Sequence, residues 1–334
     1  MKAAPCSIHG ALGVGAAVAD PGTQIETGTR PLRSAALIVN THSRRGADFF
    51  PATVEQLARH GIRIAAAYSV FNPERLPDVT REAIALGHQL VIVGGGDGTI
   101  RSVVDCFAYT DVVLGILPLG TANTFARTLG IPATLDGAVD VIANGRVAAV
   151  DLGRIGDVYF TTDASAGFAT EVSRQTPRVL KRYLGMLAYG LVGAKQFFRH
   201  RPFRCTLTIR GQAYALQTHQ VIVANGACVG VKTLVPGATL NDGELVVLAI
   251  DTLSRWKLFK MALFFWIGRQ TSLPNTQYWR TSDVTIATEP PRRVDVDGEV
   301  ATETPVRVAV ARAALKVMTP AAFVDQPSSP AKTL

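Results

Sequence analysis

The chain has 334 residues, of which 48% are hydrophobic, and this length favours two domains around a sizeable core. Its formal net charge of +8 at pH 7 favours an anionic partner such as a nucleotide or an acidic membrane face. The sequence has no zinc module, basic heptad region or helix-turn-helix pattern, so we do not expect it to bind nucleic acid. The four widely spaced cysteines lack metal-ligand spacing and indicate buried thiols in a reducing compartment.

The first 33 residues are rich in Gly, Ala and Thr and lack periodicity, so we expect a disordered tail at 1–33. A signal peptide is the alternative, although only Lys2 would supply its positive start. No apolar run approaches the roughly 20 residues of a membrane-spanning helix. We therefore expect a cytoplasmic protein whose membrane contact is peripheral.

From residue 35 the chain alternates between strand-like and helix-like segments. Each of the last two strands runs through a glycine-containing loop into a helix. Such alternation predicts a parallel sheet covered on both faces, which is a three-layer α/β domain. The expected strands are 35–40, 62–69, 89–93 and 112–117, and the expected helices between them are 47–60, 78–86 and 99–108.

The loop after the third strand reads Gly94-Gly95-Gly96-Asp97-Gly98-Thr99. A strand that turns on glycines into a helix leaves backbone N–H groups bare and predicts a phosphate site. Asp97 would repel a bare phosphate, so it indicates magnesium, bound directly or through water, or a hydroxyl that must be oriented. The letters match neither the Walker pattern nor the dinucleotide fingerprint, and a tight structural turn remains the simpler alternative.

A second loop follows the strand at 112–117 and contains Gly120, Thr121 and Asn123 before the next helix. The carboxyl ends of parallel strands meet at one edge of a sheet, so we expect both loops to line the same crevice.

Beyond residue 146 the pattern changes to short strands separated by Gly, Asn and Asp turns, with two helical stretches between them. This pattern predicts a second domain that is antiparallel and β-rich, possibly arranged as a sandwich. The expected strands are 146–152, 158–166, 203–210, 213–216, 219–225, 244–250, 284–288 and 293–296.

With its two glycine loops, the chain resembles the diacylglycerol kinase catalytic-domain family, which includes sphingosine kinases and bacterial lipid kinases and is related more distantly to NAD kinase and 6-phosphofructokinase. The resemblance covers roughly residues 35–319. The Gly-Gly-Asp-Gly-Thr motif is shared with NAD kinase, whereas Leu-Gly-Thr-Ala-Asn at 119–123 is similar to the lipid kinase branch. Two departures stand out: the Asn-Pro turn usual after the first strand is missing, and Thr124 stands where many members have Asp.

The resemblance implies the fold, the cofactors and the roles of two acidic turns. Asp297 in Asp-Gly-Glu matches the family's catalytic carboxylate, and Asp242 with Glu244 matches its metal-binding segment. Taken alone, each Asp-Gly pair is equally a hairpin turn. ATP and Mg²⁺ are the implied cofactors. The implied sites are catalytic Asp97 and Asp297, metal ligands Asp242 and Glu244, and nucleotide contacts Asn40, Gly94, Gly95, Gly96, Gly98, Thr99, Gly120, Thr121, Asn123 and Glu299.

In the family the last strands return to the first domain, which sets the expected boundaries. These are a nucleotide-binding domain at 34–150 completed by 305–325, a lipid-substrate domain at 151–304, and disordered tails at 1–33 and 326–334. Lys232 is a candidate partner for Asp242 or a phosphate, although a solvated lysine is the simpler reading. Asp151, Asp163 and the histidines, including His42, have no partner evident in the sequence and are expected to be structural or surface residues.

The acceptor is expected to be a lipid. The segment 178–201 is apolar in its middle and basic at both ends, and 254–270 carries aromatic residues, so both suit an acyl-chain cleft at an anionic membrane, although core packing explains each as well. A kinase for a soluble substrate such as NAD and a non-catalytic lipid- or nucleotide-binding regulator are the alternatives. Exposed sheet edges in the second domain would also allow a homodimer.

Overall fold

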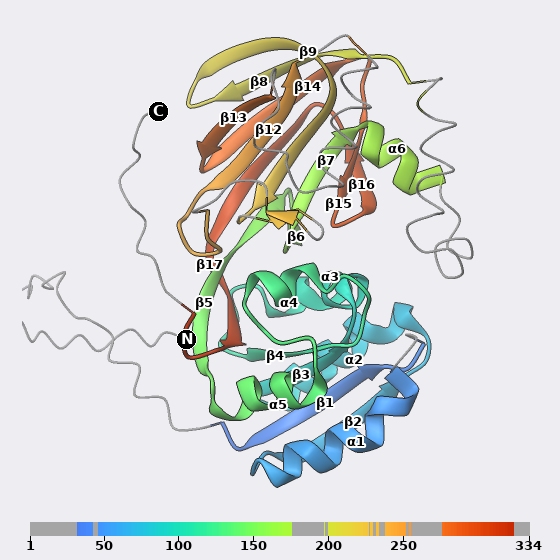
Figure 1. Cartoon of the computed structure of the whole chain (residues 1–334), viewed down its shortest axis with the longest axis vertical. Helices are drawn as coiled ribbons and strands as arrows, with labels where there is room; N and C mark the ends of the chain where they lie inside the picture. The colour runs from blue at the N-terminus through green and yellow to red at the C-terminus, as the bar shows by residue number, and fades with distance from the viewer. Residues whose placement is uncertain are drawn as a thin grey trace, which may run out of the picture. The chain divides into compact units, whose positions relative to one another are not determined.

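The computed structural model describes most of the chain between residues 32 and 323 (Figure 1). Several expected segments lie outside the described residues: the tails apart from residues 32 and 33, the side chain of Lys232, and nearly all of 178–201 and 254–270. Among the described helices, none has both the length and the apolar character needed to cross a membrane. The described residues are 32–42, 46–175, 197, 200–226, 228–229, 232–233, 238–251, 254 and 276–323.

Four parallel strands form the N-terminal part of the sheet, in the order β4-β3-β1-β2. Every residue of β3 and β4, and nearly every residue of β1, is buried. Burial on both faces explains why these strands read as continuous apolar runs. The strands are β1 (Ser34–Asn40), β2 (Arg63–Val70), β3 (Leu90–Gly95) and β4 (Val113–Pro118).

Helices cover both faces of these strands. The helices α1 and α5 contact each other, as do α2 and α3, and each pair also packs on the strands. Figure 1 shows α1 and α5 on one side of the parallel strands and α2 and α3 on the other, which confirms the expected three-layer arrangement. The bounds are α1 (Gly46–Arg59), η1 (Pro73–Arg75), α2 (Leu76–Ala85), α3 (Asp97–Phe107), α4 (Thr124–Thr128) and α5 (Leu135–Asn144).

The C-terminal part is antiparallel and β-rich, as expected. Its strands continue the sheet in the order β16-β15-β7-β9-β8-β14-β17, and a second apolar core lies among them. The elements are β5 (Arg146–Ile155), β6 (Val158–Phe160), β7 (Asp163–Gly167), α6 (Phe168–Gln175), β8 (Phe203–Ile209), β9 (Gln212–Asn225), β10 (Cys228–Val229), β11 (Lys232–Thr233), β12 (Leu245–Asp251), β13 (Thr276–Thr281), β14 (Asp283–Glu289), β15 (Arg293–Val296), β16 (Glu299–Glu303) and β17 (Val306–Thr319).

Strand β17 pairs with strands of both parts. It is antiparallel to β14 and to β5, and near its end Val317 pairs with Leu114 of the parallel strand β4. The pairing of β17 with β5 is interrupted between Ala311 and Leu315. The chain thus returns to the parallel part of the sheet through one long strand, β17.

Three of the expected strands differ from those observed. The segment 158–166 is interrupted at Thr161 and Thr162, which form a corner between β6 and β7. The segments 213–216 and 219–225 form one continuous strand, β9, because Thr218 is fully buried within it and pairs with Phe203 despite its polar side chain.

Candidate active site

The two glycine loops lie against each other at the carboxyl ends of β3 and β4. The Leu119 N–H donates a hydrogen bond of 2.8 Å to the Gly95 carbonyl oxygen. A Cβ atom added at Gly120 would lie 2.5 Å from the Cα of Gly96, which is closer than such atoms approach. Gly120 is therefore required for the backbones to meet.

The Asn123 side chain stabilises the second loop through hydrogen bonds to its backbone. Its backbone is left-handed, with φ of 47°, and its side chain is almost entirely buried. The side-chain Oδ1 accepts the Gly120 N–H at 2.9 Å, and Nδ2 donates to the carbonyl oxygens of Pro118 and Gly120. Asn is among the few residues that tolerate this backbone conformation, and here its amide also supplies the loop's hydrogen bonds.

The end of β1 is tied to the first glycine loop. Asn40 Nδ2 donates a 2.9 Å hydrogen bond to Thr99 Oγ1, and both residues are buried. Asn40 Oδ1 accepts the backbone N–H of His42 at 3.1 Å. Asn40, Thr99, Gly96 and Gly120 therefore belong to one connected assembly. Of the other expected nucleotide contacts, Gly94 and Gly95 are buried, whereas Gly98 and Thr121 are exposed on the loops.

Asp97 begins α3 and remains partly exposed. Its Oδ1 accepts the Phe125 N–H at 3.4 Å, so the carboxylate of the first loop faces the start of α4 in the second. Burial raises the pKa of Asp97, and the neighbouring charge of Asp297 raises it further, while backbone hydrogen bonds from residues 123–125 oppose the shift. Two carboxylates from distant parts of the chain therefore lie close enough for the charge of Asp297 to act on Asp97.

Asp297 lies in the turn between β15 and β16, with φ of 49°. Its carboxylate accepts four hydrogen bonds from the corner after β6. Thr161 donates to Oδ2 from its N–H at 2.9 Å and from its hydroxyl at 3.0 Å, and the N–H groups of Thr162 and Asp163 donate to Oδ1 at 2.8 and 3.1 Å. Burial raises the pKa of Asp297, and these donors oppose that shift.

The corner also brings two further carboxyl groups to the site. Burial raises the pKa of Asp163 well above its usual value, and the charges of Asp297 and Asp295 add to the shift. Asp295 on β15 is buried and accepts a 3.0 Å hydrogen bond from Ser165. No partner for Asp163 was evident in the sequence, because the two carboxyl groups that act on it, Asp295 and Asp297, lie more than a hundred positions away. Glu299, the first residue of β16, is exposed.

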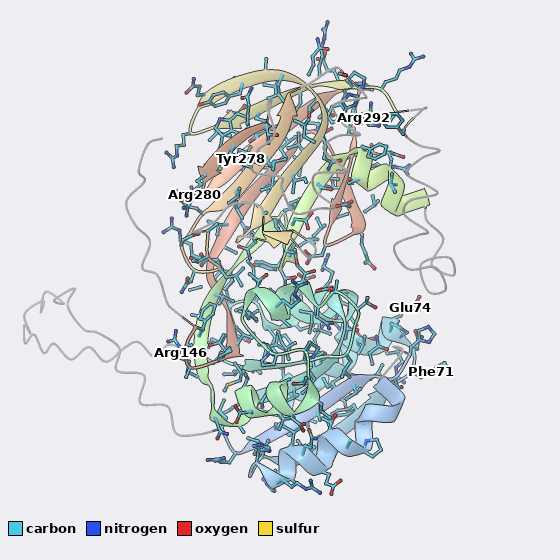
Figure 2. All side chains as sticks on the ribbon, viewed as in Figure 1. Phe71, Glu74, Arg146, Tyr278, Arg280 and Arg292 are labelled. Atoms are coloured by element: carbon cyan, nitrogen blue, oxygen red, sulfur yellow. The ribbon has the colours of Figure 1, made fainter. Side chains whose placement is uncertain are left out.

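Asp242 and Glu244 form a different contact, with Arg280 on β13, which Figure 2 labels. Asp242 Oδ2 lies 2.6 Å from an Arg280 terminal nitrogen, and Glu244 Oε2 lies 2.8 Å from Arg280 Nε. Among the described residues, no three His, Cys, Asp or Glu side chains are grouped in a way that would hold a metal ion. The assignment of Asp242 and Glu244 as metal ligands stays a prediction.

Asp151 on β5 connects the Asp242 turn to β17. Its carboxylate accepts the N–H groups of Gly243 and Ala313, both at 2.7 Å. Burial raises the pKa of Asp151, and the nearby charge of Asp242 adds to the shift. In the sequence, Asp151 is the only acidic residue of a largely apolar strand. Because acidic residues are rarely buried without a partner, this placement was the only sequence signal that Asp151 connects other elements.

Comparisons with known proteins identify the family. The diacylglycerol kinase catalytic domain matches residues 34–155, and the YegS C-terminal NAD kinase beta sandwich-like domain matches 162–319. A diacylglycerol kinase of Staphylococcus haemolyticus is 28% identical over 86% of this chain and 88% of its own. One from Staphylococcus aureus is 30% identical over 69% of this chain and 75% of its own. The chain belongs to the diacylglycerol kinase family.

Structural similarity extends over the same region. A Bacillus anthracis protein solved by crystallography and designated a diacylglycerol kinase is 25% identical, with a TM-score of 0.74, over 89% of this chain and 100% of its own. A second from that organism, at 20% identity and a TM-score of 0.69, shows the shared fold. The family, its fold and its lipid kinase class, all expected from sequence, are confirmed.

Within this diacylglycerol kinase family protein, the site draws on both matched domains. Both glycine loops and Asp97 lie in the first, at 34–155, and Asp297 lies in the second, at 162–319. The corner that holds Asp297 begins at Thr161, between the two matches.

Proposed function

We propose that this protein transfers the γ-phosphoryl group of ATP to the hydroxyl group of a lipid. The observation that supports this most strongly is the convergence of Asp97 and Asp297, 200 positions apart in sequence, beside two glycine loops that lie against each other. Phosphoryl transfer needs little covalent help from a protein. It requires a held nucleotide, neutralised charge and an aligned acceptor.

The glycine loops are the proposed nucleotide site. Gly94, Gly95, Gly96, Gly98 and Thr99 would hold phosphates with backbone N–H groups at the start of α3, an element of 11 residues whose N-terminus favours negative charge. Gly120 and Thr121 would contribute from the second loop. Asn40 and Asn123 act in this scheme by holding the loops in shape, because their amides bind loop atoms. Glu299 is the proposed contact from the other domain.

The proposed metal is Mg²⁺, which suits the residues present. Mg²⁺ takes oxygen ligands and commonly binds through one or two carboxylates together with substrate phosphates and water. Asp97 is partly exposed beside the phosphate loop and would supply such an oxygen, directly or through water. The ion would neutralise charge on the transferring group. For Asp242 and Glu244 to bind metal as well, a cation would have to take the place of Arg280.

Asp297 is the proposed acceptor of the hydroxyl proton. The four donors from residues 161–163 fix the orientation of its carboxylate and favour its ionised form. Burial works in the opposite direction and raises the pKa of Asp297. A base held between these effects is suited to accept a proton near neutral pH.

Relatives named diacylglycerol kinase, and a Citrobacter koseri relative named as a YegS-like lipid kinase that is 39% identical over 49% of this chain, support a lipid acceptor. The net charge of +8 supports peripheral binding to an anionic membrane face from the cytoplasm. A homodimer paired through exposed sheet edges remains part of the proposal.

The decisive experiment incubates the protein with Mg²⁺, γ-labelled ATP and a total lipid extract, followed by separation and identification of labelled products. A labelled lipid is expected, and Asp297→Asn should retain ATP binding while losing label transfer by about a hundredfold or more. Asp297→Asn with normal turnover would remove Asp297 as the base.

Two other outcomes would overturn the lipid kinase assignment. A labelled water-soluble product would favour the soluble-substrate kinase, a reading that the NAD kinase beta sandwich-like match keeps open. Tight ATP binding with no transfer to any acceptor would favour a non-catalytic regulator.

A further inference from the structure

An exposed aromatic pair lies at the carboxyl ends of β1 and β2. Phe71 follows the last residue of β2 and is 72% exposed, more than any other large hydrophobic side chain among the described residues. Its ring meets the His42 ring nearly edge to face, with centroids 5.4 Å apart and planes at 82°. Figure 2 shows Phe71 at the outer margin of the parallel-strand part, near Glu74. Burying so much aromatic surface against a ligand would be favourable.

Hydrogen bonds connect this pair to the phosphate loop. The Thr41 N–H donates to the Val70 carbonyl oxygen at 3.0 Å, which joins the residues just before the two rings. Asn40 accepts the His42 N–H and donates to Thr99 of the glycine loop. The rings and the loop therefore belong to one continuous edge.

The spacing along this edge suits a nucleotide. The strand order β3-β1-β2 separates the glycine loop from Phe71 by two strand spacings, roughly 10 Å in all. That separation leaves room for the ribose that links a base to its phosphates. Open parallel sheets bind ligands along the carboxyl edge of their strands, and aromatic side chains stack on any base because every base has a π-face.

Among the described residues, the other large exposed hydrophobic side chains of the parallel part lie at the opposite edge. Leu86, 63% exposed, precedes β3, and Tyr109, 62% exposed, precedes β4. Phe71 therefore does not belong to a general apolar surface. Glu74 and Arg75 follow it within one short turn, so their side chains give that turn no net positive charge to attract an anionic membrane.

We propose that Phe71, with His42 fixing its ring, is a stacking platform for the nucleotide base and sets nucleotide affinity. This inference rests on the proposed function, because it assumes that ATP phosphates occupy the glycine loops. It adds a residue that no glycine or acidic motif would identify.

The test measures binding of two magnesium-complexed probes, ATP and inorganic tripolyphosphate, by calorimetry. Tripolyphosphate has phosphates but no base. Phe71→Ala should weaken ATP binding by about tenfold, since stacking of one base contributes roughly 1–3 kcal/mol, and should leave tripolyphosphate binding unchanged. Phe71→Trp should restore ATP affinity. In turnover assays Phe71→Ala should raise KM for ATP and leave kcat at saturating ATP unchanged.

Tyr109→Ala is the matched control, because it removes an equally exposed ring from the opposite edge. Equal ATP affinity for wild type and Phe71→Ala would overturn the inference while leaving the proposed function intact. Loss of binding to phosphatidylglycerol vesicles by Phe71→Ala, with ATP binding unchanged, would overturn it in favour of a membrane contact. A wild-type protein that binds neither probe would instead contradict the proposed function itself, and this inference with it.

Discussion

At the scale of single residues, Asp297 shows how one carboxylate is adjusted by opposing effects. Its removal from water favours the neutral form, whereas hydrogen bonds from Thr161, Thr162 and Asp163 favour the charged form. Removing a single hydrogen-bond donor should therefore shift the pKa of Asp297 while leaving its carboxyl group in place.

Thr161→Val removes the hydroxyl that donates to Asp297 at 3.0 Å and keeps the backbone N–H that donates at 2.9 Å. Loss of a donor to the charged form raises the pKa of Asp297 further. If Asp297 must be ionised to accept a proton, the acid limb of the kcat profile should move to higher pH while the plateau is retained. The measurement is kcat against pH at saturating substrates.

Thr162→Val provides the control, because the Thr162 hydroxyl contacts the Thr161 hydroxyl at 3.4 Å while its backbone N–H is the donor to Asp297. An acid limb unchanged in Thr161→Val, or moved equally in both variants, would count against Asp297 as the base.

His200 makes folding stability depend on pH at a place away from the carboxylates proposed to be catalytic. Burial lowers its pKa from 6.5 to about 4, and the nearby His219 and Arg292 lower it further. A histidine with a depressed pKa is neutral in the folded protein, while the unfolded chain takes up a proton below about 6.5. Folding stability should therefore decline as the pH falls from 6.5 towards 4.

His200→Asn should remove this component, so its thermal midpoint should fall less than that of wild type between pH 7.5 and pH 5. The difference corresponds to about 2 kcal/mol at pH 5. His60→Asn, at an exposed histidine, is the matched variant and should follow wild type. Parallel acid losses in wild type and His200→Asn would refute the assignment.

At the scale of elements, β13 carries the cation that holds the turn before β12. Arg280 contacts both Asp242 and Glu244, and Asp242 is only 8% exposed. Arg280→Met should lower stability by about 1–3 kcal/mol, because a buried carboxylate loses its charged partner. It also frees two carboxylates that were expected to bind metal.

Mg²⁺ added without nucleotide should therefore raise the thermal midpoint of Arg280→Met more than that of wild type. Arg307→Met breaks an exposed ion pair with Asp283 and should show no such gain. An equal effect of Mg²⁺ on wild type and Arg280→Met would show that the ion binds elsewhere.

The glycine loops and most strands were predictable because their signals are local. Continuous apolar runs such as 112–117 predict buried parallel strands, and Gly120 followed by Asn123 predicts a turn into a helix. The edge strand β16 gave no such signal, because its residues are exposed or only partly buried and show no alternation. The corner at Thr161 could not be predicted either, because the carboxylate that it binds lies 136 positions away in the sequence.

At the scale of the whole molecule, β5 and β17 carry the connection between the parallel and antiparallel strands. The break in their pairing between Ala311 and Leu315 is held by Asp151, which accepts the Ala313 N–H from β17 and the Gly243 N–H from the turn before β12. Because β17 pairs with both β14 and β4, unfolding of one part removes a partner strand from the other. Such sharing favours cooperative unfolding.

Asp151→Ala tests whether this carboxylate couples the two parts. The change leaves the buried Gly243 N–H and the partly buried Ala313 N–H without their acceptor and should cost about 1–3 kcal/mol. Calorimetry of wild type should show one transition that ATP and Mg²⁺ move upward by mass action. In Asp151→Ala the transition should separate into two, of which only the component that contains the glycine loops moves with ATP. Asp111→Ala, which breaks a surface ion pair with Lys316 of the same strand, should keep the single transition. A single ATP-responsive transition in Asp151→Ala would mean that backbone pairing along β17 is sufficient for the coupling.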